Sequence, residues 1–327
     1  MTSDIRIKMK DGRLAKVKPI SVKWKCDAGS YCDTCTIQLP LHPYMVSKNT
    51  GTDVLSGERV CLFAVGGSVS VSLGYDGNNA QRFAGFLSAV NYDENIELKA
   101  EGYYYQLKGK RIDKSWKKVT LKQLLQYVTT GTDIKLSSDI PNIDLGPVSI
   151  KNAGVDKIFD WLKSEFKCEI NFCLNTLYAG ALTYGQTGET KKLRMGWNVR
   201  EGKLTVQPAK EQVQINLVMK DSKGKTERVK STQKKYKSVK DEHIHSGLPA
   251  AYLKSVCQRM QDEVNNEGRL GGDITAFLIP SFRPGMVAQV DDTRYPDRGG
   301  HFFIKTVEGS FDKTGGKQKL NLRYYGE

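Results

Sequence analysis

Apolar and polar side chains alternate in several short runs within the first hundred residues. Val69, Val71 and Leu73 are separated by serines, and residues 34–39 and 96–101 alternate in the same way. A period of two is typical of a strand that buries one face. Turn sequences rich in Gly, Asn and Asp separate these runs, at residues 66–67, 75–79 and 92–95. Closely spaced strands with such turns predict a sandwich or a barrel.

The middle of the chain changes to a helical period. Residues 120–131 predict a helix, with Thr120 and Gln123 as a capping box and Gly131 as its end. Its apolar stripe consists of Leu121, Leu124, Leu125 and Val128. A second helix is expected after Asn152. Its buried face would consist of Val155, Ile158, Phe159, Leu162 and Phe166. Apolar segments at 148–150 and 168–172 flank it, which indicates a small α/β unit over about 112–198.

Strand patterns resume after Lys203, and Val213, Ile215 and Leu217 alternate with polar residues. One amphipathic helix is predicted after Pro249, ending at Gly268. Its apolar face would contain Leu253, Val256, Cys257, Met260 and Val264. Three further strands are expected, at 285–290, 301–308 and 318–325.

The two strand-rich ends of the chain are similar to each other. "GERVCLF" at 57–63 parallels "GMVAQV" at 285–290, and "FAGFLSAV" at 83–90 parallels "FFIKTVEGSF" at 302–311. Each of the latter two leads through a turn into an alternating strand that closes on paired tyrosines. An internal duplication explains this similarity, but so does chance, because strands use a limited set of residues.

Length and composition indicate a globular protein of two or three domains. The 327 residues are 39% hydrophobic and 26% charged. No apolar run approaches the roughly 20 residues that cross a bilayer. Since residues 1–12 lack the apolar core of a signal peptide, we expect synthesis and folding in a cytoplasm.

The net charge of +14 raises the possibility of a nucleic-acid partner. Half of this positive charge lies between Lys220 and Lys240. This stretch contains eight lysines, one arginine and two acidic residues, a net charge of +7. Such a run is more typical of a solvated hairpin or mobile loop than of a binding face. Nucleic-acid binding therefore stays the alternative function.

The seven cysteines favour core packing over a disulfide framework, because their number is odd and several lie in apolar segments. They are Cys26, Cys32, Cys35, Cys61, Cys168, Cys173 and Cys257. Cys32 and Cys35 have C-x-x-C spacing without a second pair. If both lie in the strand at 34–39, they point to opposite faces and cannot share a metal.

Other candidate chemistry is weak. His243 and His245 could share one face of a strand, but no further ligand is near in sequence. Asp291 and Asp292 lie in a loop, and "DKTGG" at 312–316 is typical of a hairpin turn. No P-loop and no G-x-S-x-G motif occurs. We therefore predict no catalytic, cofactor-binding or metal-binding residue, no cofactor and no enzyme activity.

Five segments in order resemble the baseplate hub proteins of phage tails, the late control protein D group. This group includes the Mu-type hub and relatives in contractile injection systems. The segments are "FAGFLSAV", "IELKAEGYYYQLKGK", "KVTLKQLLQYVTTGTDI", "GGDITAFLIPSFRPGMVAQV" and "GGHFFIKTVEGSFDKTGGKQKLNLRY". They extend over most of the chain, although each motif is loose. The lysine-rich stretch at 220–240 is not an expected feature of the family.

The resemblance implies an α+β, mainly β fold with two β-barrel-like hub domains and an inserted small α/β domain. The implied boundaries are 1–111, 112–200 and 201–327, the last with a helix at about 250–267. Three chains would form a ring of six similar units, which joins a threefold spike to a sixfold tail tube. The implied role is a structural component of a phage or prophage tail baseplate.

The implied partners are two further copies in a homotrimer, the tail spike protein, the tail tube protein and other baseplate proteins. DNA would only pass through the ring, with no membrane insertion. Edge strands around 60–74 or 285–307 would join subunits, and tyrosines within 102–111 would pack at a barrel edge or interface. The lysines of 220–240 are expected on an exposed loop outside the channel. A cell-wall hydrolase at the tail tip is a third possibility, without a visible catalytic cluster.

Overall fold

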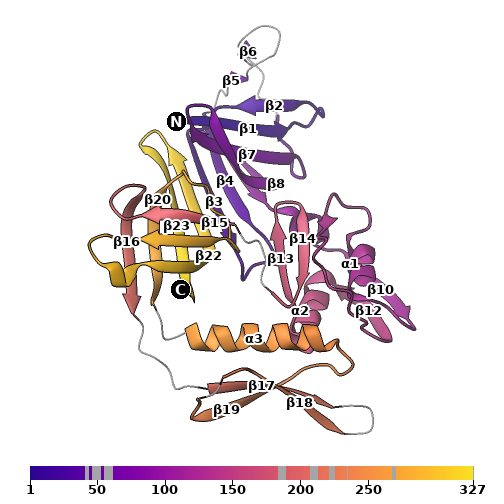
Figure 1. Ribbon diagram of the computed structural model, residues 1–327. Coiled ribbons are helices and arrows are strands. Elements are labelled where there is room, and N and C mark those ends of the chain that lie inside the picture. Colours follow the sequence, from indigo (N-terminus) through magenta and orange to yellow (C-terminus); the bar gives the residue numbers. More distant parts are fainter. Residues whose placement is uncertain are drawn as a thin grey trace. The chain divides into compact units, whose positions relative to one another are not determined.

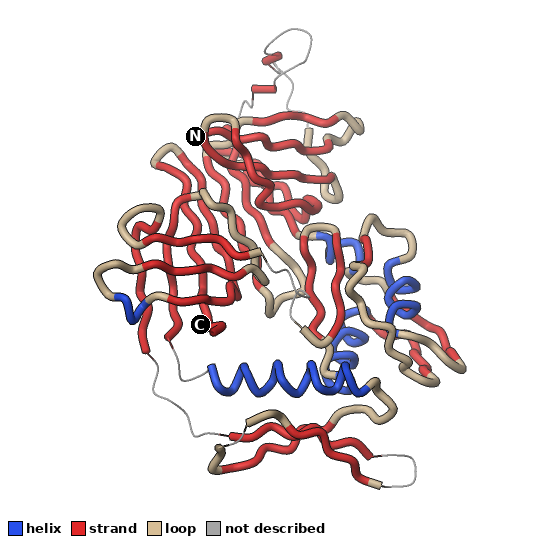
Figure 2. The backbone as a smooth tube through the Cα atoms, viewed as in Figure 1, coloured by secondary structure: helices blue, strands red, loops and turns tan. Residues whose placement is uncertain are grey.

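The computed structural model describes most of the chain as two compact units (Figure 1). The described residues are 1–40, 44–45, 53–54, 62–182, 189–206, 213–220, 225–233, 235–266 and 270–326. The β unit comprises 1–105, 189–203 and 272–322, and the α/β unit comprises 106–188, 204–271 and 323–327. The three α-helices in the described ranges all belong to the α/β unit (Figure 2). No described helix is long and apolar enough to cross a membrane.

The β unit consists of short and medium strands from both ends of the chain. Those of the N-terminal half are β1 (Thr2–Lys8), β2 (Leu14–Val17), β3 (Ser21–Asp27), β4 (Thr34–Pro40), β5 (Tyr44–Met45), β6 (Asp53–Val54), β7 (Ser68–Tyr75), β8 (Asn78–Tyr92) and β9 (Asn95–Glu101). Those of the C-terminal half are β15 (Thr190–Arg194), β16 (Val199–Val206), β20 (Leu270–Phe277), β21 (Val287–Asp291), β22 (Gly300–Asp312) and β23 (Gly315–Gly326). Two 3-10 helices, η1 (Tyr103–Leu107) and η2 (Pro296–Arg298), complete the elements of this unit.

One continuous sheet connects the two halves of the β unit. Its main path runs β16-β20-β23-β22-β3-β4-β9-β8-β7-β1-β2-β5-β6, and β21 and β15 branch from β22. The connection is the antiparallel pair β22–β3, in register from Thr306 opposite Asp27 to Asp312 opposite Ser21. This pair joins the first of the three predicted segments to the last within one sheet, and the domain boundaries at 111 and 200 stay a prediction.

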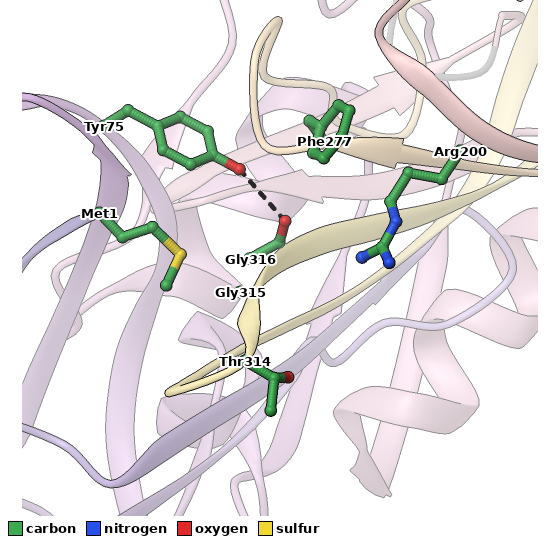
Figure 3. A pocket seen from close by; sticks show the side chains of 7 residues that line it. All are labelled: Met1, Tyr75, Arg200, Phe277, Thr314, Gly315 and Gly316. Atoms are coloured by element: carbon green, nitrogen blue, oxygen red, sulfur yellow. Dashed lines mark hydrogen bonds between the residues drawn. The ribbon is translucent and has the colours of Figure 1, made fainter. Parts of the chain in front are cut away.

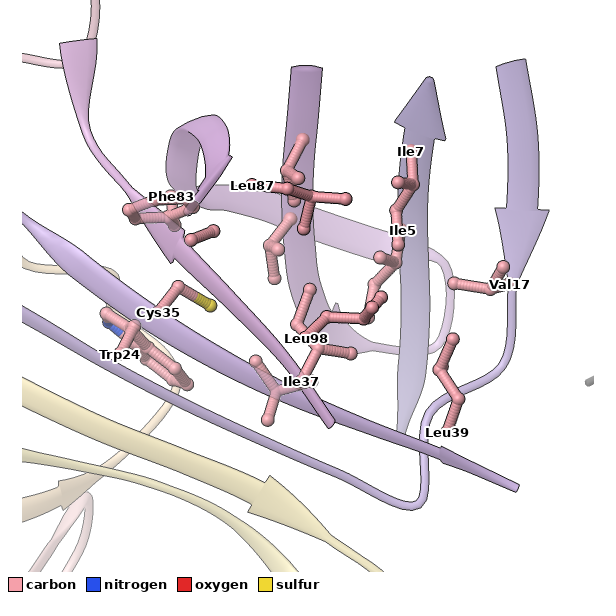
Figure 4. Close-up of a cluster of buried hydrophobic side chains, with 14 of the residues drawn as sticks. Ile5, Ile7, Val17, Trp24, Cys35, Ile37, Leu39, Phe83, Leu87 and Leu98 are labelled. Carbon is pink, nitrogen blue, oxygen red and sulfur yellow. The ribbon is translucent and has the colours of Figure 1, made fainter. Parts of the chain in front are cut away.

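The alternating patterns of the N-terminal half are confirmed. The apolar positions of β4, β7 and β9 are buried, and they pack with side chains from β1, β2, β3 and β8 in one core (Figure 4). The residues labelled there are Ile5, Ile7, Val17, Trp24, Cys35, Ile37, Leu39, Phe83, Leu87 and Leu98. Burying one face of each strand in this way is the main favourable contribution to folding.

Each half contains an antiparallel meander with a long middle strand. In the N-terminal half β8, of 15 residues, lies between β7 and β9; in the C-terminal half β22, of 13 residues, pairs with β21 and β23. The flanking strands differ, since β15 joins β21 in parallel. Residues 57–61 of the predicted repeat lie outside the described residues, so the duplication stays a hypothesis.

The prediction that strands around 60–74 or 285–307 form free edges is wrong. Strand β7 lies between β1 and β8, and β21 lies between β15 and β22. Strand β22 pairs with β23 on one side and with β21 and β3 on the other. Their backbone groups are used within one chain, so these strands do not join subunits by backbone pairing.

The described residues of the α/β unit form three small sheets and three helices. Its elements are β10 (Arg111–Trp116), α1 (Leu121–Thr129), β11 (Lys135–Leu136), β12 (Val148–Gly154), α2 (Val155–Phe166), β13 (Glu169–Cys173), β14 (Thr176–Gly180), β17 (Val213–Lys220), β18 (Thr226–Lys230), β19 (Ser238–His243) and α3 (Ala250–Asn266). The sheets are β10-β12, β11-β14-β13 and β18-β17-β19.

The predicted helices are confirmed, with small differences at their ends. At α1 the Thr120 hydroxyl accepts the Gln123 N–H at 3.3 Å, and the Gln123 side chain accepts the Thr120 N–H at 3.0 Å. Gly131 follows with a φ of 79°, a conformation that glycine adopts without strain. The five predicted apolar residues of α2 are all buried. Helix α3 begins directly after Pro249, while Gly268 lies outside the described residues.

The lysine-rich stretch is exposed, as predicted, and its described part includes β18, the first residues of β19, and the residues 231–233 and 235–237, which lie outside any strand. Strands β18 and β19 flank β17, and α3 packs on the sheet (Figure 1). Glu227, Asp241 and Glu242 form ion pairs with neighbouring cations there. Strand β17 is buried on both faces from Gln214 to Met219, where simple alternation was expected. Its central place in the sheet, under α3, explains the difference.

Candidate assembly surface

A pocket of about 570 Å³ on the β unit brings together residues from five strands and their ends (Figure 3). Its lining consists of Met1, Tyr75, Arg200, Phe277, Thr314, Gly315 and Gly316. Met1 precedes β1, Tyr75 ends β7, Arg200 lies on β16 and Phe277 ends β20. Thr314 lies in the β22–β23 turn, and Gly315 and Gly316 begin β23. The lining is therefore assembled by the sheet from both halves of the β unit.

The turn at 312–316 forms one wall of the pocket, and it is the hairpin that the sequence predicts. The Asp312 carboxylate accepts the backbone N–H of Thr314 at 2.7 Å and its hydroxyl at 2.6 Å. These bonds lower the pKa of Asp312 below its ordinary value. The Tyr75 hydroxyl donates to the carbonyl of Gly316 at 3.2 Å (Figure 3). A Cβ at Gly316 would lie 2.5 Å from the Leu278 side chain, so glycine is needed there.

Arg200 is the single charged residue among those that line the pocket. Its guanidinium lies 5.8 Å from the ring centroid of Phe277, which is 40% exposed. A cation over an aromatic face is attracted by the negative face of the ring. The pocket therefore offers an exposed ring and a positive charge side by side.

A second arginine lies behind this lining. Arg82 on β8 is only 4% exposed, and it donates to the carbonyl of Leu278 and, at 3.4 Å, to the side-chain oxygen of Gln318. Its Nε is buried without a partner among the described residues. Burial, and the charge of Arg283 to a smaller extent, lower the pKa of Arg82 to about 10. A buried cation without a carboxylate is costly, because it has lost its hydration.

Gln318 holds the segment after β20 in place. Its Nε2 donates to the carbonyls of Phe277 at 2.8 Å and Pro280 at 2.6 Å, and its Oε1 accepts the N–H of Phe282 at 3.3 Å. Sequence reasoning missed this residue and Arg82. The available signal was a polar residue on an apolar strand face, since Gln318 lies two residues before the buried Leu320.

Asp33, just before β4, is a further titratable group in the β unit. Burial raises the pKa of its carboxyl to about 7, although the Cys26 thiol, the backbone of Asp27 and the charge of Arg283 act in the opposite direction. The carboxyl thus changes charge near neutral pH, which a carboxyl in water does not do.

The cysteines and histidines considered from the sequence make structural contacts. Cys35 lies in the core on β4, while Cys32 precedes the strand, with its sulfur 3.7 Å from the Glu101 carboxylate. His245 stacks on Phe166 with ring centroids 4.9 Å apart, and His243 is exposed at the end of β19. Within the described ranges no group of three or more His, Cys, Asp or Glu could hold a metal ion.

The paired carboxylates do not form a common site. Asp291 ends β21 and lies 3.8 Å from the guanidinium of Arg194. Asp292 is buried and accepts the backbone N–H groups of Arg294 and Tyr295, at 3.0 and 3.1 Å. An Asp side chain that accepts the backbone N–H groups two and three residues later stabilises the turn that it begins.

No protein-family model and no curated protein matches this sequence. Solved structures do match it over nearly the whole chain. The 43 kDa tail protein of prophage MuSo2 from Shewanella oneidensis is 14% identical, with a TM-score of 0.65, over 99% of this chain and 98% of that one. A tail protein from Neisseria meningitidis is 12% identical, with a TM-score of 0.65, over 99% of this chain and 97% of that one.

A component of the type VI secretion system of E. coli has the same fold. It is 13% identical, with a TM-score of 0.59, over 98% of this chain and 77% of that one, and it is described as similar to the T4 tail proteins gp27 and gp5. The chain therefore has the α+β, mainly β fold of phage tail proteins and of this secretion component. At these identities the likeness defines the fold.

Proposed function

We propose that this chain is a structural component of a phage or prophage tail baseplate, a hub ring between the tail tube and the central spike. The observation that carries the proposal is the shared fold with a prophage tail protein and a second tail protein, over 99% of this chain and nearly all of theirs.

The architecture suits such an adaptor. The continuous sheet of the β unit contains one long-stranded meander from each half of the chain, joined by β22 and β3. A homotrimer would present six meanders, so a threefold ring could meet a sixfold tube. In this proposal the segments 1–111 and 201–327 provide the two hub domains, and 112–200 provides the α/β domain between them.

The partners in this role are two further copies, the tail spike, the tail tube and other baseplate proteins. The chain would be made in the cytoplasm of the bacterial host and would function in the virion tail without catalysis, with DNA only passing through the ring. Nucleic-acid binding has less support, because the described lysine-rich strands carry ion pairs with Glu227, Asp241 and Glu242.

Deletion of the gene from its phage or prophage tests this function. We expect free tubes or absent tails in electron micrographs, and intact tails when the gene is supplied from a plasmid. A matched plasmid that encodes a truncated chain, residues 1–105 alone, is the control and should not restore tails. Normal infectious tails in the deletion strain would contradict the proposal.

A further inference from the structure

The pocket beside Arg200 lies next to an open edge of the sheet. Strand β16 hydrogen-bonds to β20 on one side. On its other side the described residues provide only an isolated bridge between Met195 and Val199. Arg200 and Lys203, further along β16, are exposed. An edge strand of this kind presents unpaired N–H and C=O groups to which an extended segment can add.

The cations of this edge differ in their surroundings, because Lys203 is close enough to Asp273 on β20 to lower the pKa of that carboxyl, and Glu201 lies between the two cations on β16. Arg200 forms no ion pair within the described part of the chain, and its contact is the Phe277 ring. Behind the lining, Arg82 is buried and has an unpartnered Nε. Its acceptors are the carbonyl of Leu278, the residue after Phe277, and the side chain of Gln318, two residues after Gly316 on β23. The exposed guanidinium of Arg200 thus favours an anionic group in the pocket.

We infer that this edge and pocket bind an extended, acidic segment of another tail protein. The segment pairs its backbone with β16 and places a carboxylate, next to an apolar side chain, between Arg200 and Phe277. Backbone pairing supplies affinity in this mode, and the side-chain pocket supplies specificity. Only the assignment of the partner to a tail rests on the proposed function; the chemistry of the segment rests on the pocket.

Charge selects an acidic partner over a second copy at this edge. The chain carries a net charge of +14. Strand β16 itself carries Arg200, Glu201 and Lys203, so pairing with β16 of a second copy would bring two strands of net positive charge together. Like charges brought together across an interface oppose association, whereas an acidic segment is attracted.

A pair of peptides tests the inference on the full chain. The probe is a fluorescein-labelled octapeptide of alternating Thr and Val with one central Asp, and the matched neutral peptide has Asn in its place. Fluorescence anisotropy at low salt should give about fivefold tighter binding of the Asp peptide, as expected for one partly exposed ion pair. Hydrogen exchange of the β16 amides should slow when this peptide is added.

Two variants locate the binding. Arg200→Gln should remove the preference for the Asp peptide, whereas Arg194→Gln, an exposed arginine on β15 outside the lining, should keep it. Equal binding of both peptides, no binding of either, or a preference that persists in Arg200→Gln would overturn the inference. So would protection of β16 that grows with protein concentration without peptide, because a second copy would then occupy the edge. A chain that restores tails but fails these tests overturns this inference and leaves the proposed function in place.

Discussion

Single buried polar residues organise the β unit, and Gln318 is the clearest case. It is fully buried, and its amide contacts Phe277, Pro280 and Phe282 of one segment as well as Arg82. A buried donor or acceptor that loses its partner costs the full desolvation of that group. The pocket lining therefore depends on a residue that does not itself line the pocket.

Replacement of Gln318 should destabilise the β unit strongly. We expect Gln318→Leu to lower the free energy of unfolding by about 2–4 kcal/mol, because two carbonyls, one N–H and the Arg82 guanidinium lose a partner. Lys317→Leu, at the exposed neighbouring position, is the control and should change it by less than about 0.5 kcal/mol. Urea unfolding followed by tryptophan fluorescence measures both, and equal effects of the two changes would refute this role.

Asp33 should make stability depend on pH. Its pKa of about 7 in the folded chain lies above the ordinary value of 3.8, so the fold favours the protonated form. The stability that this group contributes is therefore present below about pH 4 and is lost as the pH rises towards 7. Urea unfolding at pH 5 and pH 8 should show that the free energy of unfolding decreases less between these two pH values for Asp33→Asn than for the native chain. Asp93→Asn, in an exposed turn, is the control and should lose as much free energy of unfolding between pH 5 and pH 8 as the native chain. The same loss in all three chains would contradict the prediction.

At the scale of elements, local sequence patterns were sufficient to predict where a strand or helix lies. They were not sufficient to predict which strands pair with each other. The alternation at Val69, Val71 and Leu73 and the stripe of α2 depend on residues within one strand or helix, so the sequence predicts them well. The pairing of β22 with β3 joins residues about 280 positions apart, and no local pattern contains it. For the same reason a free edge was expected at β7 or β21, whereas among the described strands β15 and β16 each have only one neighbouring strand. The pocket residues come from five strands and their ends, and thus could not be assembled from the sequence.

The attachment of α3 to β17 provides a prediction at this scale. Gln261 is buried on α3; its Oε1 accepts the Ile215 N–H at 2.9 Å, and its Nε2 donates to the Val213 carbonyl at 2.9 Å. Gln261→Ala should lower the free energy of unfolding by about 1–3 kcal/mol and speed hydrogen exchange at residues 213–217. Gln258→Ala, one turn earlier and exposed, should leave exchange in β17 unchanged. Unchanged protection in Gln261→Ala would show that apolar packing alone holds the helix.

At the scale of the whole molecule, the proposed trimer is open to a direct prediction. Light scattering of the purified chain, alone and with the spike and tube proteins of the same phage, should give a species of three times the chain mass of 36.6 kDa. Since the strands first expected to join subunits are paired within the chain, the trimer contacts should consist mainly of side chains. A higher salt concentration should then dissociate the trimer if ion pairs dominate these contacts, and should leave the trimer intact if apolar side chains dominate them.

In the proposed function this chain is the adaptor between the tail tube and the spike. Electron cryo-microscopy of purified tails measures that most directly. We predict three copies of the chain in one ring at the junction of the tail tube and the spike, with the β unit contributing two meanders per copy. Tails whose tube–spike junction is complete without this chain, or that contain it only at another position, would contradict the account.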